Sequence, residues 1–443
     1  MTTDRASNTS GMRHDAVPDG VEDDALAIDG RGRHVLLLQG PSSPFMAHLG
    51  AALRARGARV SKIHLCPGDW VMWRGGGAHI YRGKVEDWRD YVARFAAAEG
   101  VTDLICLSSA RRYHQDAIAV LAPTGVRTTI IEHGYLRPGY LLAEPEGTGG
   151  ESHFPREGSL IEALANSPVA EPDALPAARA GSFALYAALD VTWNLANVFF
   201  SWVITPGYRR HALDHPLKEY SGWIGKLLTQ RARSRLAKDV TDNLSAEDGP
   251  VFLLPLQLET DFQIRRYGTG WSLREELEET IVSFAAHAPK NARLLVKTHP
   301  LDNRAAPWAR RTASMAWRQG VEGRVLFVDG GDLDLMLKHA AGVVTVNSTV
   351  GLTAILRGVP VIALGDAVYD LPELTHQGDL ADFWRDPQMP DATRAQILQT
   401  ALLKTVHVGG AFDGAGMAEG AAGIADKALS APPFGPFAHQ DPT

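Results

Sequence analysis

The chain reads Val251-Phe252-Leu253-Leu254-Pro255-Leu256-Gln257-Leu258-Glu259-Thr260-Asp261 at the point where a solidly apolar run gives way to polar residues. An apolar run of this length is typical of a strand that is buried on both faces, as in parallel sheets covered by helices. In open α/β sheets ligands bind outside the carboxyl ends of the strands, so we predict a site at Gln257, Glu259 and Asp261. The alternative is a polar loop that only caps the next helix.

The residues after this stretch alternate between helical and strand patterns. Ser272-Leu273-Arg274-Glu275 has the spacing of a capping box at the start of a helix. Further strands are predicted at Arg293 to Thr298, Arg324 to Val328, Gly342 to Val346 and Val359 to Leu364. Strands in this rhythm predict a Rossmann-like domain, which we place at residues 246–405, with a C-terminal tail over residues 406–443.

The first half of the chain shows the same alternation. Strands are predicted at His34 to Gln39, Val60 to Cys66, Thr102 to Leu107 and Arg127 to Ile131, with helices between them. We therefore predict an α/β protein with two Rossmann-like domains, the first over residues 34–245. Residues 1–33 lack the apolar core of a signal peptide and are predicted to be a disordered leader.

The composition limits the class of protein. A chain of 443 residues exceeds the size that one hydrophobic core comfortably fills, so two domains are expected. Its formal charge of −7 argues against a protein that grips nucleic acid through bulk positive charge. Cys66 and Cys106 are the only cysteines, and each lies in an apolar run. Neither a disulfide framework nor a Cys-based metal site is predicted, and a reducing, cytoplasmic setting fits.

A second polar motif, Glu132-His133-Gly134-Tyr135-Leu136-Arg137-Pro138, follows the strand that ends at Ile131. A carboxylate at a strand tip is placed like a general acid or base, and the glycine after it would let the backbone approach a ligand closely. The alternative is a structural glutamate that only pairs with Arg137.

The second domain carries polar groups suited to a phosphate. Its strands end in Lys297-Thr298-His299-Pro300 and in Asn347-Ser348-Thr349. Hydroxyls at a helix N-terminus make a phosphate site together with the free backbone N–H groups, and His299 can donate to the same anion. No GxxxxGK[ST] sequence is present, which favours a nucleotide held as a leaving group over an ATP whose γ-phosphate is transferred. A structural histidine is the alternative for His299.

A long apolar stretch, Ala184 to Ile204, raises the question of a membrane. Asp190, Asn194 and Asn197 interrupt it, so we predict a buried or membrane-surface helix rather than a spanning one. The residues beyond it are locally cationic. They include Arg209, Arg210, Lys218, Lys226, Arg231, Arg233, Arg235 and Lys238. This region is either an ordinary solvated helix face or a surface for anionic lipid.

Several motifs, in this order along the chain, resemble the capsular polysaccharide synthesis family, KpsS type. They are Leu36-Leu37-Leu38-Gln39-Gly40-Pro41, Gly68-Asp69-Trp70, Glu132-x-Gly134-Tyr135-x-Arg137-Pro138, Pro255-Leu256-Gln257-x-x-x-Asp261, His299-Pro300-Leu301-Asp302 and Asn347-Ser348-Thr349. The resemblance covers roughly residues 34 to 400 and implies a β-Kdo glycosyltransferase with a GT-B-like fold, in which two Rossmann-like domains face a cleft. It implies CMP-Kdo as the donor and a (lyso)phosphatidylglycerol-type lipid or lipid-linked Kdo as the acceptor. It also implies a cytoplasmic protein, peripheral at the inner face of the inner membrane.

The same resemblance implies roles for single residues. Asp261 is the expected nucleophile of a retaining double displacement, Glu132 the acid/base and Gln257 the residue that orients the sugar. The expected nucleotide-sugar ligands are Lys297, His299, Pro300, Asn347, Ser348 and Thr349. The expected acceptor cleft contains Gln39, Gly40, Asp69, His114, Gly134 and Arg137. Relatives usually carry a second acidic residue where this chain has His133, and a Gly-Asp pair where it has Ser108-Ser109.

We also have expectations for cofactors and partners, and for the functions that compete with a glycosyltransferase. No DxD-like pair in a nucleotide site and no Cys/His cluster occurs, so neither a metal nor a cofactor is expected. A KpsC-like transferase and the capsule export machinery are the implied protein partners. The rivals are a non-catalytic export or assembly protein that binds a lipid-linked glycan, a transferase with another sugar-nucleotide donor, and a nucleotide-sugar epimerase. Carboxylates on both sides of a cleft favour a transferase, because a binding protein has no need of them.

Overall fold

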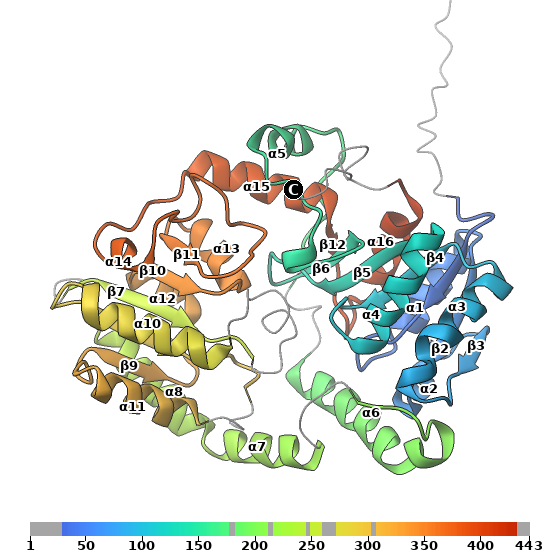
Figure 1. Cartoon of the computed structure of the whole chain (residues 1–443), viewed down its shortest axis with the longest axis horizontal. Coiled ribbons are helices and arrows are strands. Elements are labelled where there is room, and N and C mark those ends of the chain that lie inside the picture. The colour runs from blue at the N-terminus through green and yellow to red at the C-terminus, as the bar shows by residue number, and fades with distance from the viewer. Residues whose placement is uncertain are drawn as a thin grey trace, which may run out of the picture.

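The structure is a computed structural model that describes residues 29–176, 182–210, 216–244, 249–258, 272–302 and 307–431. Two α/β lobes lie next to each other, and each is built around one sheet (Figure 1). Of the predicted leader, residues 1–33, the first 28 lie outside the described residues.

The first sheet has seven strands. In spatial order they are β12 (His407–Gly409), β6 (Tyr140–Pro145), β5 (Arg127–His133), β4 (Asp103–Leu107), β1 (His34–Leu37), β2 (Arg59–His64) and β3 (Ala78–Ile80). Strands β1 to β5 pair in parallel, whereas β6 and β12 add an antiparallel edge beside β5. Every strand predicted in this half is present, and β3, β6 and β12 are additional.

The second sheet has five strands, all parallel. In spatial order they are β11 (Val361–Ala363), β10 (Ala340–Thr345), β7 (Val251–Pro255), β8 (Arg293–Lys297) and β9 (Val325–Val328). The order β9-β8-β7-β10-β11 repeats the order β3-β2-β1-β4-β5 of the first sheet, which is the doubly wound arrangement of Rossmann-like domains. The predicted α/β class with two such domains is confirmed.

Helices cover both faces of each sheet, because successive side chains of a strand point to opposite faces. The described helices of eight residues or more are α1 (Phe45–Ala55), α3 (Trp88–Glu99), α4 (Arg112–Leu121), α5 (Gly158–Ala165), α6 (Phe183–Ile204), α7 (Pro216–Leu228), α8 (Gln230–Asp242), α10 (Leu273–His287), α11 (Trp308–Arg318), α15 (Ala392–Thr405) and α16 (Met417–Leu429). The shorter ones are α2 (Pro67–Met72), α12 (Leu333–His339), α13 (Thr349–Ile355) and α14 (Leu380–Phe383). On β7, Phe252 and Leu254 pack with α10 and α11, whereas Val251 and Leu253 pack with α8, α12, α13 and α15.

The basic helices α7 and α8 belong to the second domain, not to the predicted first domain of residues 34–245. Arg209, before them, stays with the first domain, where its N–H donates to Tyr113 OH at 3.1 Å. Ala237 of α8 is buried in the apolar cluster that contains Val328 of β9. Arg233 Nη1 lies 2.9 Å from Asp329 Oδ1. Part of the cationic stretch therefore pairs inside the protein, and the chain passes between domains in the interval between α6 and α7.

The expected C-terminal tail, residues 406–443, is an ordered part of the first domain as far as it is described. β12 pairs with β6, with His407 opposite Leu142. α16 packs on α1, where Ile424 joins the core cluster of Leu49. The sequence did not indicate that these C-terminal residues pack on the first domain, because pairing between residues so far apart in the sequence leaves no local pattern.

Candidate active site

The ends of β7 and β10 meet at the switch point of the second sheet, where strand order reverses direction. Gln257 and Asn347 each follow one of these parallel strands. Gln257 Nε2 donates to Asn347 Oδ1 at 2.9 Å, and the Asn347 N–H donates to Gln257 Oε1 at 3.4 Å. The structure thus brings together polar residues from the ends of two neighbouring parallel strands. Gln257 is buried, so it holds the Asn347 loop in place rather than standing open to a sugar.

Ser348 has a structural task beside its predicted one. Its Oγ accepts from the Val350 N–H at 3.2 Å and so caps α13, whose first residue is Thr349. Tyr369 OH donates to the Ser348 carbonyl at 2.6 Å. The cap uses Oγ as an acceptor and leaves its hydrogen able to donate to an anion.

His299 lies after β8, on the other side of β7. The Leu301 N–H donates to His299 Nδ1 at 3.0 Å, so the neutral ring carries its hydrogen on Nε2. Burial and the nearby charges of Arg137, Lys297 and Lys226 lower the pKa of His299 to about 4. At neutral pH the side chain is therefore an uncharged N–H donor.

Arg137, in the loop after β5 of the first domain, influences His299 of the second domain. It lies close enough to His299 to oppose protonation of the imidazole, although the two residues belong to different domains. Its Nε donates to the Gly134 carbonyl at 3.0 Å, which fixes the guanidinium against its own loop. A phosphate placed between Arg137 and His299 would meet a cation and a neutral donor.

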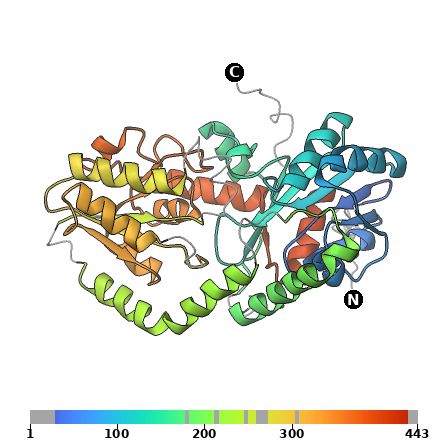
Figure 2. The same ribbon diagram turned by 60° about the horizontal axis from the view of Figure 1, so that its bottom comes forward.

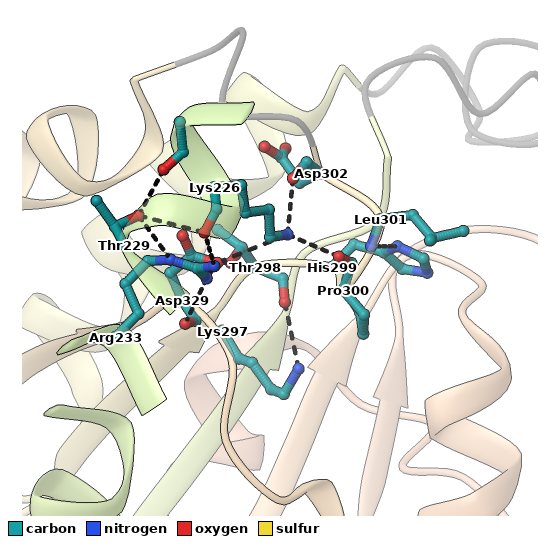
Figure 3. A network of polar contacts seen from close by, with 11 residues as sticks. Lys226, Thr229, Arg233, Lys297, Thr298, His299, Pro300, Leu301, Asp302 and Asp329 are labelled. Carbon is teal, nitrogen blue, oxygen red and sulfur yellow. Dashed lines mark hydrogen bonds and ion pairs between the residues drawn. The ribbon is translucent and has the colours of Figure 1, made fainter. Parts of the chain in front are cut away.

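The loop that carries His299 is held by a residue that the sequence did not single out for this task (Figure 3). Lys226 of α7 donates from Nζ to the Pro300 carbonyl at 2.6 Å and to the Asp302 carbonyl at 2.7 Å. Its Nζ also lies 3.8 Å from Asp329 Oδ1. In the sequence Lys226 is one cation in a basic run, and no local signal marks it.

Lys297, predicted to bind the nucleotide-sugar, is buried. Its Nζ donates to the Thr298 carbonyl at 3.2 Å, and burial and Lys226 lower its pKa. Lys297 therefore helps to lower the pKa of His299 through its charge, and its own side chain is not accessible to a ligand. Pro300 is exposed, but its carbonyl is taken by Lys226.

In the first domain, the predicted cleft residues Gln39 and Asp69 are buried and bonded to each other. Gln39 Nε2 donates to Asp69 Oδ2 at 3.4 Å. Arg111 Nη1 donates to Gln39 Oε1 at 3.1 Å and to the Gly40 carbonyl at 3.3 Å. The pair thus orients Arg111, a half-buried residue at the switch point between β1 and β4. The Arg-x-x-His spacing of Arg111 and His114 was the available signal for it.

His114 does not line a cleft, contrary to the prediction. It is fully buried, and its Nδ1–H donates to the Ser108 carbonyl at 2.9 Å. Ser108 has a φ of 62°, in the left-handed region that favours glycine. His114 therefore stabilises a turn whose backbone is strained at Ser108.

The two predicted cleft glycines serve packing. A Cβ at Gly40 would overlap the side chain of Met46. At Gly134 it would lie 2.8 Å from the Tyr140 carbonyl oxygen. Gly134 was expected to let the backbone approach a ligand closely. The structure gives another reason for a glycine here, because the protein's own backbone occupies the space that a Cβ would need.

Glu132 stands at the end of β5, half-buried and opposite Leu142 of β6. On the neighbouring strand β6 lies Glu144, a buried carboxyl that accepts from Ser152 Oγ at 2.5 Å. Burial raises the pKa of Glu144 to about 7, and the nearby charge of Glu132 acts in the same direction. The acid/base role of Glu132 stays a prediction.

The predicted nucleophile Asp261, together with Glu259, lies outside the described residues. Within the described part of the chain, no group of three or more His, Cys, Asp and Glu side chains is arranged to hold a metal ion. The expectation that no metal or cofactor is needed therefore stays a prediction.

Comparisons with known proteins place the chain in a family. Residues 102–412 match the family described as "Capsule polysaccharide biosynthesis protein". The chain is 28% identical over 386 residues to the "Capsule polysaccharide modification protein LipB" of Neisseria meningitidis serogroup A, covering 86% of this chain and 91% of that protein. It is 26% identical over 396 residues to the "Capsule polysaccharide export protein KpsS" of Escherichia coli, covering 88% and 100%.

Among solved structures, a β Kdo 2,7 transferase, KpsC of Thermosulfurimonas dismutans, aligns with a TM-score of 0.41 at 14% identity. The alignment covers 84% of this chain and 90% of that chain. The family match itself spans well over half of the sequence. The chain therefore belongs to the capsule polysaccharide biosynthesis protein family.

Proposed function

We propose that this protein is a retaining β-Kdo glycosyltransferase. It uses CMP-Kdo to glycosylate a (lyso)phosphatidylglycerol-type lipid, or a lipid-linked Kdo, during synthesis of the capsule linker. The observation that carries the proposal is that the charge of Arg137, in the first domain, reaches His299 in the second and lowers the pKa of its imidazole, since a transferase must hold donor and acceptor between its domains. Family membership supplies the capsule context.

The donor side is built for an anionic leaving group. His299 Nε2–H and Arg137 would hold the CMP phosphate and stabilise the charge that develops as the glycosidic bond to CMP breaks. Ser348 and Thr349 would contribute hydroxyl donors, and the bonded pair Gln257 and Asn347 keeps their loop in position. Because the pKa of His299 is about 4, this donor stays neutral across physiological pH.

Transfer then proceeds in two displacements. Asp261 attacks the anomeric carbon, CMP departs with the bonding electron pair, and a covalent glycosyl-enzyme forms. Glu132 takes the proton of the acceptor hydroxyl, whose oxygen attacks the same carbon and releases the Asp261 carboxylate. Two inversions retain the configuration of the sugar.

A peripheral position at the inner membrane follows from the lipid acceptor. In the described part of the chain, one helix, Ala184–Ile204, is long and apolar enough to cross a membrane. Its polar residues have partners within the protein: Asn197 Oδ1 accepts from the Gly68 N–H at 2.7 Å, and Asn194 Nδ2 donates to Asp190 Oδ2 at 3.0 Å. The contact between Asn197 and Gly68 supports a helix that lies against the first domain. The implied partners, a KpsC-like transferase and the capsule export machinery, fit the same location.

The proposal is tested by the release of CMP from CMP-Kdo with and without lysophosphatidylglycerol. We expect slow release without lipid and faster release with it, together with a Kdo-modified lipid in the mass spectrum. A second CMP-sugar and a UDP-sugar, offered in parallel, test the donor. Binding of a lipid-linked glycan without release of any nucleotide would instead identify an export or assembly protein.

Transfer is expected to persist in EDTA. The charge of the departing phosphate can be balanced by Arg137 and by the Nε2–H of His299, so the chemistry does not require a divalent ion. The measurement compares initial rates in EDTA and in excess Mg²⁺. A rate that is lost with the chelator and restored by Mg²⁺ would contradict this prediction.

A further inference from the structure

Helix α6 exposes a row of large apolar side chains. Phe199 is 61% exposed, Phe200 54% and Trp202 76%. The opposite side of the helix is buried, because Trp193 packs against Gly68 of α2 and Asn197 bonds to it. The outward face has no partner among the described residues that would shield it from water.

Helix α7, on the second domain, also exposes large apolar side chains. Leu227 is 54% exposed and Leu228 82%. The two helices meet where Tyr220 OH lies 3.3 Å from Asp190 Oδ2. In both views they lie along the same side of the molecule, α6 beneath the first domain and α7 beneath the second (Figures 1 and 2).

We infer that α6 and α7 form one bilayer-docking surface, made of Phe199, Phe200, Trp202, Leu227 and Leu228, and that Lys226 links this surface to the donor site. The inference deepens the proposed function and rests on it for the identity of the donor. Membrane docking then acts on both domains at once.

The chemistry of the surface favours an anionic bilayer as the occupant. Aromatic and aliphatic side chains beside cations are typical of helices that lie in the membrane interface. Arg231 and Arg235 are exposed on α8, directly after α7. Arg82, also exposed, donates from Nη2 to the Val203 carbonyl at 2.9 Å, next to the end of α6. These cations would meet lipid phosphates while the apolar side chains enter the headgroup region.

The link to the donor site follows from the two faces of α7. Leu227 and Leu228 point outward, whereas the adjacent Lys226 points inward and is 7% exposed. Lys226 Nζ holds the carbonyls of Pro300 and Asp302, directly after His299 (Figure 3). A bilayer that steadies α7 therefore steadies the loop of His299, and Lys226 acts as a positioning residue.

Vesicle binding tests the surface without relying on transfer. The full-length protein is floated with vesicles of phosphatidylglycerol and phosphatidylcholine, and with phosphatidylcholine alone. We expect binding to the anionic vesicles that weakens in high salt, and a loss of about tenfold or more in Trp202→Ser and in the double variant Leu227→Ser/Leu228→Ser. Trp317→Ser is the matched control and should bind normally, because Trp317 is 72% exposed on α11, which covers the opposite face of the second sheet from α8.

Two outcomes would contradict the inference that α6 and α7 dock on a bilayer. The variants could bind vesicles as the unchanged protein does, which would remove α6 and α7 from docking. Alternatively, sedimentation could show a dimer that the Leu227→Ser/Leu228→Ser variant dissociates, which would make the face an interface between copies of the chain. Neither readout depends on CMP-Kdo, so a failure here is distinct from a failure of the proposed transfer reaction.

The link through Lys226 has its own readout, the ratio of CMP affinities with and without anionic vesicles. We expect vesicles to tighten CMP binding several-fold in the unchanged protein. Lys226→Met should still float with the vesicles but lose this dependence, and Lys226→Arg should retain part of it. An equal ratio in the unchanged protein and in Lys226→Met would disprove the link.

Discussion

Asp261→Asn is expected to reduce turnover of CMP-Kdo by several powers of ten, the scale seen when a nucleophile is removed. Asparagine keeps the shape of the side chain but cannot form the covalent glycosyl-enzyme. CMP binding depends on the loops of His299 and Ser348, so it should survive. Turnover is measured by CMP release with the lipid acceptor, and CMP binding by calorimetry.

Glu132→Gln is the comparison that separates the nucleophile from the acid/base. This variant should form the adduct from CMP-Kdo alone but transfer it slowly, since its assigned task is to deprotonate the acceptor hydroxyl. Mass spectrometry of the intact protein with donor alone distinguishes the two variants. An adduct on the Asp261→Asn protein, or near-normal turnover by it, would remove Asp261 from the nucleophile role.

His299→Ala is expected to lower kcat/KM for CMP-Kdo by about 10²- to 10³-fold, the usual cost of deleting a donor at a developing negative charge. His299→Gln should recover part of the loss, because its amide can donate from a position near that of Nε2. The pKa of His299 is lowered to about 4, so its protonation begins only well below pH 6. The loss in His299→Ala should therefore be the same at pH 6 and pH 8.

His287→Ala serves as the control for His299→Ala. His287 is the exposed last residue of α10 and has no assigned role. Its replacement should leave kcat/KM unchanged. If both variants lose the same activity, or if the loss in His299→Ala shrinks steeply between pH 6 and pH 8, as it would for a cationic imidazole that deprotonates over this range, His299 does not act as a neutral donor.

Local patterns were enough to predict the strands and the polar residues at their ends. The run from Val251 to Leu256 is apolar because both faces of β7 are covered, and such a run is visible without any knowledge of its neighbours. The capping box at Ser272 and Glu275 is equally local, and both of its hydrogen bonds are present. The hydrogen bonds between Gln257 and Asn347 were not predicted, although both residues follow parallel strands, which end at one edge of a sheet.

Other features could not be predicted, because they depend on which surfaces meet. Gln39, Asp69 and His114, which follow strands or lie in the first turn of a helix, were predicted to line a cleft, yet they are buried and orient Arg111 or Ser108. Burial is a property of the packed molecule. A polar side chain at a strand tip has the same local sequence whether it faces a ligand or another side chain.

By itself the sequence determined that there are two α/β domains, most of their strands, and the family that the chain resembles, since periodicity and short motifs are local. Only the tertiary structure decided that α7 and α8 belong to the second domain and that β12 and α16 return to the first. It also decided that the charge of Arg137 reaches His299. Each of these facts joins residues far apart in the chain, as Lys226 and Asp302 are. Such contacts are selected by the free energy of packing whole surfaces together, and no short stretch of sequence encodes that energy.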